Sequence, residues 1–223
     1  GAFAEMVVMR DENLVTVPDD VPLRKAALAE PLACGWHAVR LGAAALSLHL
    51  KDAACHVIGG GAIGVGAALA LRAFGATKIT VAEPNALRRA TLDQIDGFDA
   101  VTPDVVTSAD LVIDGVGYAA TRADATKITN PGGVIMHIGL GEGAGGLDIR
   151  RMTLQEISFV GTYTYTAQDF RDTAEAIFDG RLGALDWTEQ RSLSQGQAAF
   201  DDIRAGRVAA PKIILEPTGD DLA

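Results

Sequence analysis

The chain has 223 residues, of which 48% are hydrophobic and 22% charged, as in an ordinary globular protein of one large or two small domains. The formal net charge of −10 argues against nucleic-acid or anionic-membrane partners. No apolar run is long enough to span a bilayer, and no signal peptide is recognisable. Two cysteines, Cys34 and Cys55, are too few for a disulfide framework or a four-thiolate zinc site, and favour a reducing, cytoplasmic location.

The N-terminal region predicts two short strands followed by helices. Apolar and polar residues alternate over Phe3–Met9 and Leu14–Val17, which is typical of strands. A helix is expected from Leu23 to Leu28, and an alanine-rich helix from Ala38 to Leu50. The stretch 29–37, which reads Ala-Glu-Pro-Leu-Ala-Cys-Gly-Trp-His, separates the two helices.

A glycine-rich loop follows the first buried strand and organises the rest of the chain. The apolar run 54–58 meets Gly59-Gly60-Gly61, a helical pattern begins at Ile63, and a second strand at 78–82 ends on Glu83. This is the full context of a Gly-x-Gly-x-x-Gly dinucleotide motif, with an acidic residue about twenty positions later. A structural strand-to-helix turn is the alternative.

Each position of this motif has a mechanical role. Gly59 makes the tight turn, Gly61 lets the backbone approach a pyrophosphate, and Gly64 lets the helix pack close to the strand. The N–H groups at the start of that helix, on Ala62 and Ile63, hold the phosphates. Glu83 accepts hydrogen bonds from the adenosine ribose and repels a 2′-phosphate, which favours NAD over NADP.

The later elements alternate between strand and helix. The expected elements after Glu83 are helix Asn85–Ile95, strand Ala100-Val101, strand Leu111–Ile113, helix Ala119–Ile128, a turn at Asn130–Gly133, strand Val134–Ile138, strand Ile157–Gly161, helix Ala167–Asp179, an extended stretch Trp187–Leu193, helix Gln195–Ala205 and strand Ala210–Leu215. Such alternation predicts an α/β fold with a parallel, doubly wound sheet and right-handed crossovers. Ligands of these sheets bind at the carboxyl ends of the strands, and the ends predicted here are glycine-rich or acidic.

In these motifs the chain resembles the medium-chain, zinc-type alcohol dehydrogenase family, and most closely its sorbitol and polyol dehydrogenase branch. The segments that carry the resemblance are Glu30–Gly35, the glycine loop with Glu83, Asp114–Gly117, Pro131–Gly133, Gly139-Leu140 and Lys212–Leu215. The resemblance implies a Rossmann domain flanked by the remnant of a GroES-like, β-rich catalytic domain. The implied boundaries are 1–36 for the remnant, 37–162 for the NAD-binding domain and 163–223 for the return to the catalytic domain.

The resemblance also implies a metal site that this sequence matches at one position. Glu30 stands where the family has a third metal ligand, so it is the expected catalytic and metal-binding residue; a helix-terminal Glu beside a proline is the alternative. The family's upstream zinc ligands, a Cys and a Gly-His-Glu segment, do not occur in the sequence. The chain therefore looks like a family member without roughly its first third.

Further residues are implied at the cofactor. Cys34 backs the nicotinamide ring. The alternative is that Cys34 and His37, whose side chains are soft metal ligands, bind a metal. Arg88 reaches the ribose or is a solvated helix charge, and Lys212 lies near the pyrophosphate or is a sheet-edge lysine. His137 is an acid or base near the nicotinamide, or a buried, hydrogen-bonded histidine. The expected cofactor-binding set is Cys34, Gly59, Gly61, Ala62, Ile63, Gly64, Glu83, Arg88, Gly115, Val116, His137, Ile138, Gly139 and Lys212.

Two functions follow from these patterns. The first is an NAD-dependent alcohol or polyol dehydrogenase, in which zinc polarises the alcohol oxygen of a small substrate. The second is a dinucleotide-binding fragment without catalysis of its own. An apolar strand at 157–161, at the edge of the predicted sheet, predicts a homodimer or a tetramer of such dimers.

Overall fold

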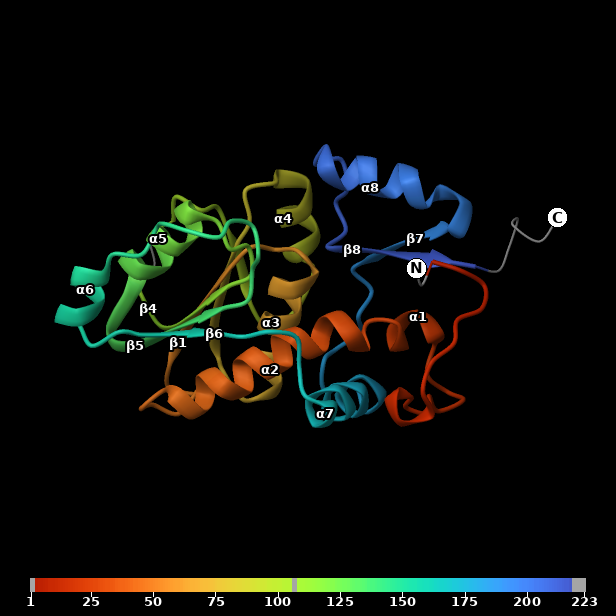
Figure 1. Cartoon of the computed structure of the whole chain (residues 1–223), viewed down its shortest axis with the longest axis horizontal. Coiled ribbons are helices and arrows are strands. Elements are labelled where there is room, and N and C mark those ends of the chain that lie inside the picture. Colours follow the sequence, from red (N-terminus) through yellow and green to blue (C-terminus); the bar gives the residue numbers. More distant parts are fainter. Residues whose placement is uncertain (1–2, 106–107, 218–223) are drawn as a thin grey trace.

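Six parallel strands form the centre of the protein in a computed structural model that describes residues 3–105 and 108–217 (Figure 1). The strands lie in the order β3-β2-β1-β4-β5-β6. Their bounds are β1 Ala54–Ile58, β2 Lys78–Ala82, β3 Asp99–Val101, β4 Ala109–Asp114, β5 Thr129–His137 and β6 Ser158–Gly161. The strand order reverses between β1 and β4, the position at which doubly wound sheets bind ligands. The predicted fold class is confirmed.

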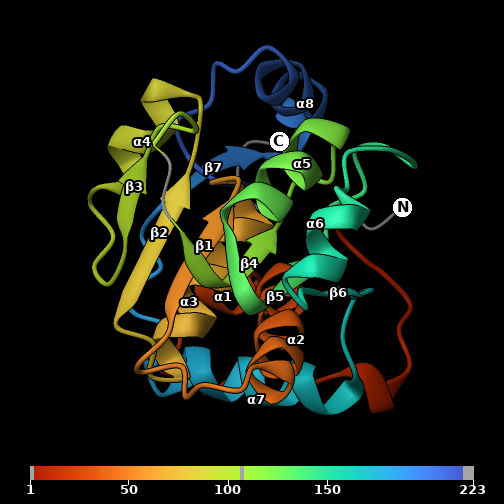
Figure 2. The same ribbon diagram turned by 90° about the vertical axis from the view of Figure 1, so that its left-hand side faces the viewer.

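Helices cover both faces of this sheet (Figures 1 and 2). One face carries α2 (Ala29–Ala45), α3 (Ala62–Ala73), α4 (Ala86–Leu92) and α7 (Ala167–Phe178). The other carries α5 (Ala119–Ile128) and α6 (Ile149–Leu154). Because the central strands are buried from both sides, they are continuous apolar runs rather than alternating ones.

A glycine sets the closest helix contact. A Cβ atom on Gly35 of α2 would lie 2.4 Å from the backbone nitrogen of Ala67 in α3. Only a residue without a side chain lets the two helices approach this closely. The contact presses α3, and with it the glycine loop, against the sheet.

A smaller unit follows the sheet. Strands β7 (Thr188–Ser192) and β8 (Lys212–Glu216) pair in parallel, and the short helix η2 (Leu193–Gln195) and α8 (Gly196–Arg204) connect them. The chain before α2 contains η1 (Asp11–Asn13) and α1 (Leu23–Ala26). Within residues 3–105 and 108–217, no helix is long and apolar enough to cross a membrane.

Two predictions about the N-terminal region are wrong. Residues 3–9 and 14–17 are extended but form no strand, because the described part of the chain offers them no partner strand. The stretch 29–37 is not a separate connection but the first half of α2. Pro31 is tolerated there because it lies in the first turn, where its missing N–H has no partner to lose.

Two further predictions miss local structure. Residues 149–154, which show no helical signal strong enough to be predicted, form α6. The predicted turn at 130–133 lies inside β5, which begins at Thr129 and shifts its register against β4 between Ala109 and Leu111. The helix predicted to end at Leu50 ends at Ala45, and the other predicted helices and strands are confirmed to within a few residues.

Candidate functional site

The glycine loop joins β1 to α3 and leaves an open space above Gly61. Gly59 has a φ of +100°, a conformation that favours glycine. A Cβ on Gly64 would overlap the carbonyl oxygen of Gly59, so this glycine is required for the helix to pack on the loop. A Cβ on Gly61 would meet no heavy atom within 4 Å. The loop therefore has one position where another molecule can approach the backbone.

The start of α3 faces this space with unsatisfied backbone donors. Gly61 is the N-cap of α3 and provides no side-chain hydrogen bond. The first N–H groups of a helix, here those of Ala62 and Ile63, have no partner within the helix. They carry the positive end of the helix dipole, which favours an anion.

Glu83 is tied to the glycine loop. This carboxylate ends β2 and is 4% exposed. Its Oε2 accepts a hydrogen bond from the N–H of Gly60 (3.0 Å), and its Oε1 accepts one from the N–H of Asn85 (2.8 Å). A negative charge is thus held next to the loop by two backbone donors.

The neighbouring helix α4 carries Arg88. Its Nη1 lies 3.4 Å from Oε2 of Glu83, and its Nη2 lies 3.5 Å from the carbonyl oxygen of Val208. Its Nε is buried and has no hydrogen-bond partner among the described residues. Asn85 caps α4 and donates to the carbonyl of Gly206 (2.8 Å), so the start of α4 is anchored to the segment before β8. Arg88 and Glu83 therefore act on the same edge of the site.

A second buried carboxylate shapes the turn after β4. Asp114 is fully buried. Its Oδ1 accepts from the N–H groups of Val116 and Gly117 (2.9 Å each), and its Oδ2 accepts from the hydroxyl of Thr121 (2.9 Å). Nδ1 of His137 lies 3.2 Å from Oδ2. His137 is thus half-buried and hydrogen-bonded, and its role as an acid or base near the nicotinamide stays a prediction.

The loops at the carboxyl edge contact one another in series. A Cβ on Gly59 would meet Val116, and one on Gly115 would lie 3.4 Å from the backbone nitrogen of Gly64. The backbones of Gly117 and Gly139 are also in contact. The structure therefore brings these predicted residues to one edge of the sheet: Gly59, Gly61, Ala62, Ile63, Gly64, Glu83, Arg88, Gly115, Val116, His137, Ile138 and Gly139.

Lys212 is placed differently. It is the first residue of β8 and pairs with Thr188 in the two-stranded sheet. No hydrogen bond or ion pair in the described parts of the chain joins it to the glycine loop. Its role near a pyrophosphate stays a prediction.

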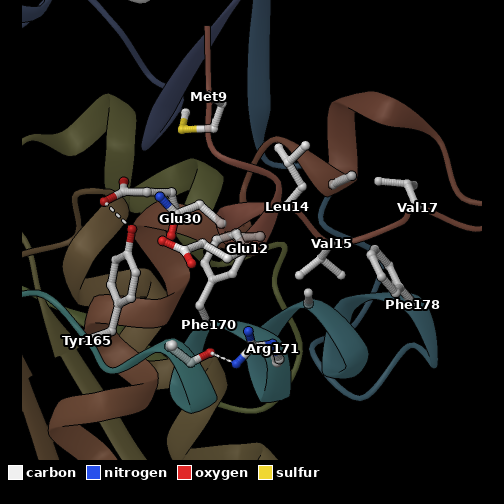
Figure 3. A pocket seen from close by; sticks show the side chains of 15 residues that line it. Met9, Glu12, Leu14, Val15, Val17, Glu30, Tyr165, Phe170, Arg171 and Phe178 are labelled. Atoms are coloured by element: carbon white, nitrogen blue, oxygen red, sulfur yellow. Dashed lines mark hydrogen bonds between the residues drawn. The ribbon is translucent and has the colours of Figure 1, made fainter.

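Glu30 lies in a cavity of about 570 Å³ between the N-terminal segment, the start of α2 and α7 (Figure 3). Its exposed carboxylate accepts a hydrogen bond from the hydroxyl of Tyr165 (3.3 Å). The rest of the wall is mainly apolar and includes Leu14, Val15 and Phe170. Tyr165 stacks on Phe170 with ring centroids 5.7 Å apart. Burial, followed by the charge of Glu30, raises the pKa of Tyr165 to about 12.

The side chains around Glu30 do not make a metal site by themselves. Burial, followed by the charge of Glu30, raises the pKa of the Cys34 thiol to about 11, and its Sγ lies 3.9 Å from the carbonyl oxygen of Glu30. Nδ1 of His37 contacts Asp169 (2.8 Å) instead. Zinc needs three or four converging donors, and no group of three His, Cys, Asp or Glu that fits a metal occurs among the described residues.

Asp169 joins α7 to α2. It is 1% exposed and contacts Nδ1 of His37 (2.8 Å) and Nε of Arg40 (2.6 Å). It also forms the capping box of α7 with Thr166. Burial opposes ionisation of Asp169, but the hydrogen bonds from Arg40, Thr166 and His37 outweigh it and hold the pKa below its usual value. This contact fixes the turn that carries Tyr165.

Asp114 is a site residue to which the sequence assigned no role of its own, and Tyr165 was expected mainly to pack or to lie in an interface. Asp114 had a signal, since it follows a buried strand directly. Tyr165 had none, because only the packing of α7 on α2 places it beside Glu30.

Comparison with known proteins assigns the family. Residues 62–179, more than half of the chain, match the model of the zinc-binding dehydrogenase family. The chain belongs to this family. The predicted medium-chain zinc-type family and its polyol-like branch are confirmed.

Relatives agree with this assignment, and a solved structure shares the fold. The chain is 31% identical to the probable diacetyl reductase [(R)-acetoin forming] 2 of Saccharomyces cerevisiae over 97% of its length and 56% of the relative's. It is 28% identical to the (R,R)-butanediol dehydrogenase of the same yeast, over 97% of its length and 61% of that relative's. Acetophenone reductase from Geotrichum candidum in complex with NAD shares the fold, with a TM-score of 0.78 and 20% identity over 90% of this chain and 58% of that one. The chain thus spans a little more than half the length of these proteins.

Proposed function

We propose that the chain is the cofactor-binding part of an NAD-dependent alcohol or polyol dehydrogenase. The observation that carries this proposal is the open position at Gly61, directly above the start of α3 and beside the buried carboxylate of Glu83. A pyrophosphate approaches the backbone there, and the free N–H groups of Ala62 and Ile63 bind it. Family membership supports the same conclusion.

The residues of this chain bind and orient the cofactor. Glu83 accepts hydrogen bonds from the adenosine ribose, and the loops after β4 and β5, at 115–117 and 138–139, form the side that receives the nicotinamide. NAD itself supplies the hydride acceptor when it is bound. Asp114 keeps these loops in place through the N–H groups of Val116 and Gly117.

A small diol or polyol is the proposed substrate class. The support comes from the relatives, whose names are those of a butanediol dehydrogenase and a diacetyl reductase. A cavity of about 570 Å³ that combines Glu30 and Tyr165 with apolar walls suits a small molecule with both hydroxyl and carbon surface.

Cofactor titration tests this function. We expect NAD to bind in isothermal calorimetry more tightly than NADP, because the carboxylate of Glu83 repels a 2′-phosphate. Tighter binding of NADP, or no binding of either dinucleotide, contradicts the proposal. A Glu83→Gln variant serves as the control for the charge.

A cofactor-binding unit without catalysis is the second candidate. It is favoured by the donor set around Glu30, which does not fit zinc without further ligands. On this account the 223-residue chain binds NAD, carries no stoichiometric zinc and does not oxidise alcohols. Elemental analysis and the absorbance of NADH in the presence of butanediol distinguish the two candidates.

We also propose that the protein is a cytoplasmic homodimer, or a tetramer of such dimers. Strand β6 is an edge of the sheet, with β5 on one side only, and an open edge invites pairing with a second copy. Both cysteines are free, which suits a reducing compartment. Light scattering that gives the mass of one chain at micromolar concentration contradicts the dimer.

A further inference from the structure

Arg122 of α5 is buried beneath the loop that follows β5. Its side chain is 5% exposed in a protein whose arginines otherwise lie near the surface or in ion pairs. Its guanidinium donates to four carbonyl oxygens: Gly117 (2.9 Å), Glu142 (3.0 Å), Gly145 (2.7 Å) and Ala144. No carboxylate within the described residues forms an ion pair with it. Burying a charge costs free energy. The hydrogen bonds to the four carbonyls offset that cost for Arg122.

These four carbonyls belong to two different loops. Gly117 lies in the turn after β4, whereas Glu142, Ala144 and Gly145 lie in the turn after β5. The second loop contains five glycines between 139 and 146, and it is largely exposed. Such a segment has few side chains of its own to hold it in one conformation. Two backbone hydrogen bonds join it to the turn after β4, from Gly141 to Val116 (3.2 Å) and from Glu142 to Gly117 (2.8 Å). Arg122 adds hydrogen bonds to three further carbonyls of this loop.

The two loops that Arg122 joins also contact the glycine loop at the carboxyl edge of the sheet. Gly117 contacts Gly139 through the backbone, and the preceding residue Val116 contacts Gly59 of the glycine loop. Glu142 adds a second tie, because its Oε2 accepts from the N–H of Ala119 (2.9 Å) at the start of α5. A displacement of the loop at 140–146 is therefore transmitted to the glycine loop through one backbone contact, between Gly139 and Gly117, and one side-chain contact, between Val116 and Gly59.

We propose that Arg122 is a positioning residue for the dinucleotide: it joins the loops after β4 and β5 and so holds in place the edge of the sheet at which the cofactor binds. The proposal rests on the proposed function and deepens it. Lysine does not replace arginine here, because a single ammonium lacks the planar fork that reaches four acceptors on two sides.

The test compares Arg122→Lys with Arg151→Lys in the protein as its gene encodes it. Arg151 is the matched control: it donates to the carbonyls of Thr126 (2.9 Å) and Thr129 (3.0 Å) at the opposite end of α5, away from the cofactor edge. Two quantities are measured for each variant, the Kd for NAD and the hydrogen exchange of the amides at 139–146 without cofactor. The melting temperature is recorded to compare the structural cost of the two substitutions.

We expect Arg122→Lys to raise the Kd for NAD about tenfold and to accelerate exchange at 139–146 by a similar factor of about ten. Arg151→Lys should leave both unchanged even where its loss of melting temperature is equal. Equal Kd values for the two variants overturn the proposal. If the parent protein binds no NAD, the proposed function is wrong. In that case unchanged hydrogen exchange at 139–146 in Arg122→Lys shows separately that Arg122 does not hold the two loops.

A second variant covers the case in which Arg122→Lys does not fold. Glu142→Ala removes the tie between the loop and Ala119 at an exposed position and leaves the guanidinium in place. It should weaken NAD binding in the same direction by about threefold. An unchanged Kd and unchanged loop exchange in Glu142→Ala contradict the role of the loop.

Discussion

The carboxyl edge of the sheet and the region around Glu30 differ in how completely this chain builds them. At the sheet edge, two buried carboxylates, Glu83 and Asp114, are each held by backbone N–H groups, and the loops contact one another. Around Glu30, an exposed carboxylate has one long hydrogen bond from Tyr165, and the described residues place no further metal ligands around it.

The difference teaches that the two regions depend on different parts of the structure. The cofactor edge is assembled from the ends of neighbouring strands, which the sheet itself brings together. A metal centre needs donors from several directions, and α2 and α7 supply one side only. Substitutions at the sheet edge should therefore change cofactor affinity, whereas substitutions around Glu30 should change the free energy of unfolding.

The largest effect is expected for Gly61→Val. A side chain there fills the open space above the loop, so the Kd for NAD should rise at least about a hundredfold, ~2.7 kcal/mol. The melting temperature should hardly change, because a Cβ at this position meets no protein atom within 4 Å. Gly161→Val, another glycine with open space around it, is the control and should bind NAD normally. Calorimetry with both proteins checks this, and equal affinities refute it.

The next effect concerns the junction of α2 with α7. Asp169→Asn should lower the free energy of unfolding by about 2 kcal/mol at neutral pH, because the buried side chain loses charge-assisted hydrogen bonds from His37 and Arg40. NAD binding should be unaffected. Urea denaturation measures the loss. Asp179→Asn, which changes only exposed contacts with the side chain and the N–H of Arg181, is the control.

The pH dependence of this difference is fixed in sign. The pKa of Asp169 is lowered in the folded protein, so its contribution is complete above the ordinary value of 3.8 and is lost as the pH falls below it. The gap between the parent protein and Asp169→Asn should therefore narrow in acid. A gap that stays constant under acidic conditions counts against the account of Asp169.

Glu83→Gln should change selectivity more than stability. The amide keeps an acceptor for the N–H of Gly60 but removes the negative charge, so the preference for NAD over NADP should shrink about tenfold. Asp93→Asn changes the net charge by the same amount at an exposed position of the same region. If that control alters the preference equally, the effect is one of overall charge and the role of Glu83 is disproved.

The smallest effect is expected for Tyr165→Phe. Loss of the 3.3 Å hydrogen bond to Glu30 should cost about 0.5 kcal/mol at neutral pH. The pKa of Tyr165 is raised from 10.0 to about 12, so its contribution is complete below pH 10.0 and is lost as the pH rises towards 12. Unfolding curves in alkali should thus converge for the two proteins. Tyr163→Phe, at a 77% exposed position, should follow the parent curve.

Local patterns were enough to predict the unit β1-α3-β2. The strand 54–58, the glycines and the strand 78–82 are predicted from neighbouring residues, and both strands have these bounds in the structure. The same holds for α5, whose bounds at 119–128 match the prediction. By contrast, apolar and polar residues alternate over 3–9 as in a strand, but these residues form no strand. Strand pairing depends on a partner segment, which a local pattern does not contain.

The sequence by itself determined the fold class, the glycine loop and the acidic end of β2, because each depends on residues close together in the chain. Only the tertiary structure decided what surrounds Glu30, where Tyr165 and Asp169 arrive from more than 130 positions away. The hydrogen bonds of Arg122 stand between these two cases. Their acceptors lie within 23 residues of Arg122, but the acceptors are backbone carbonyls. The direction of a carbonyl depends on the path of the loop and not on side-chain identity, so no residue pattern predicts these hydrogen bonds.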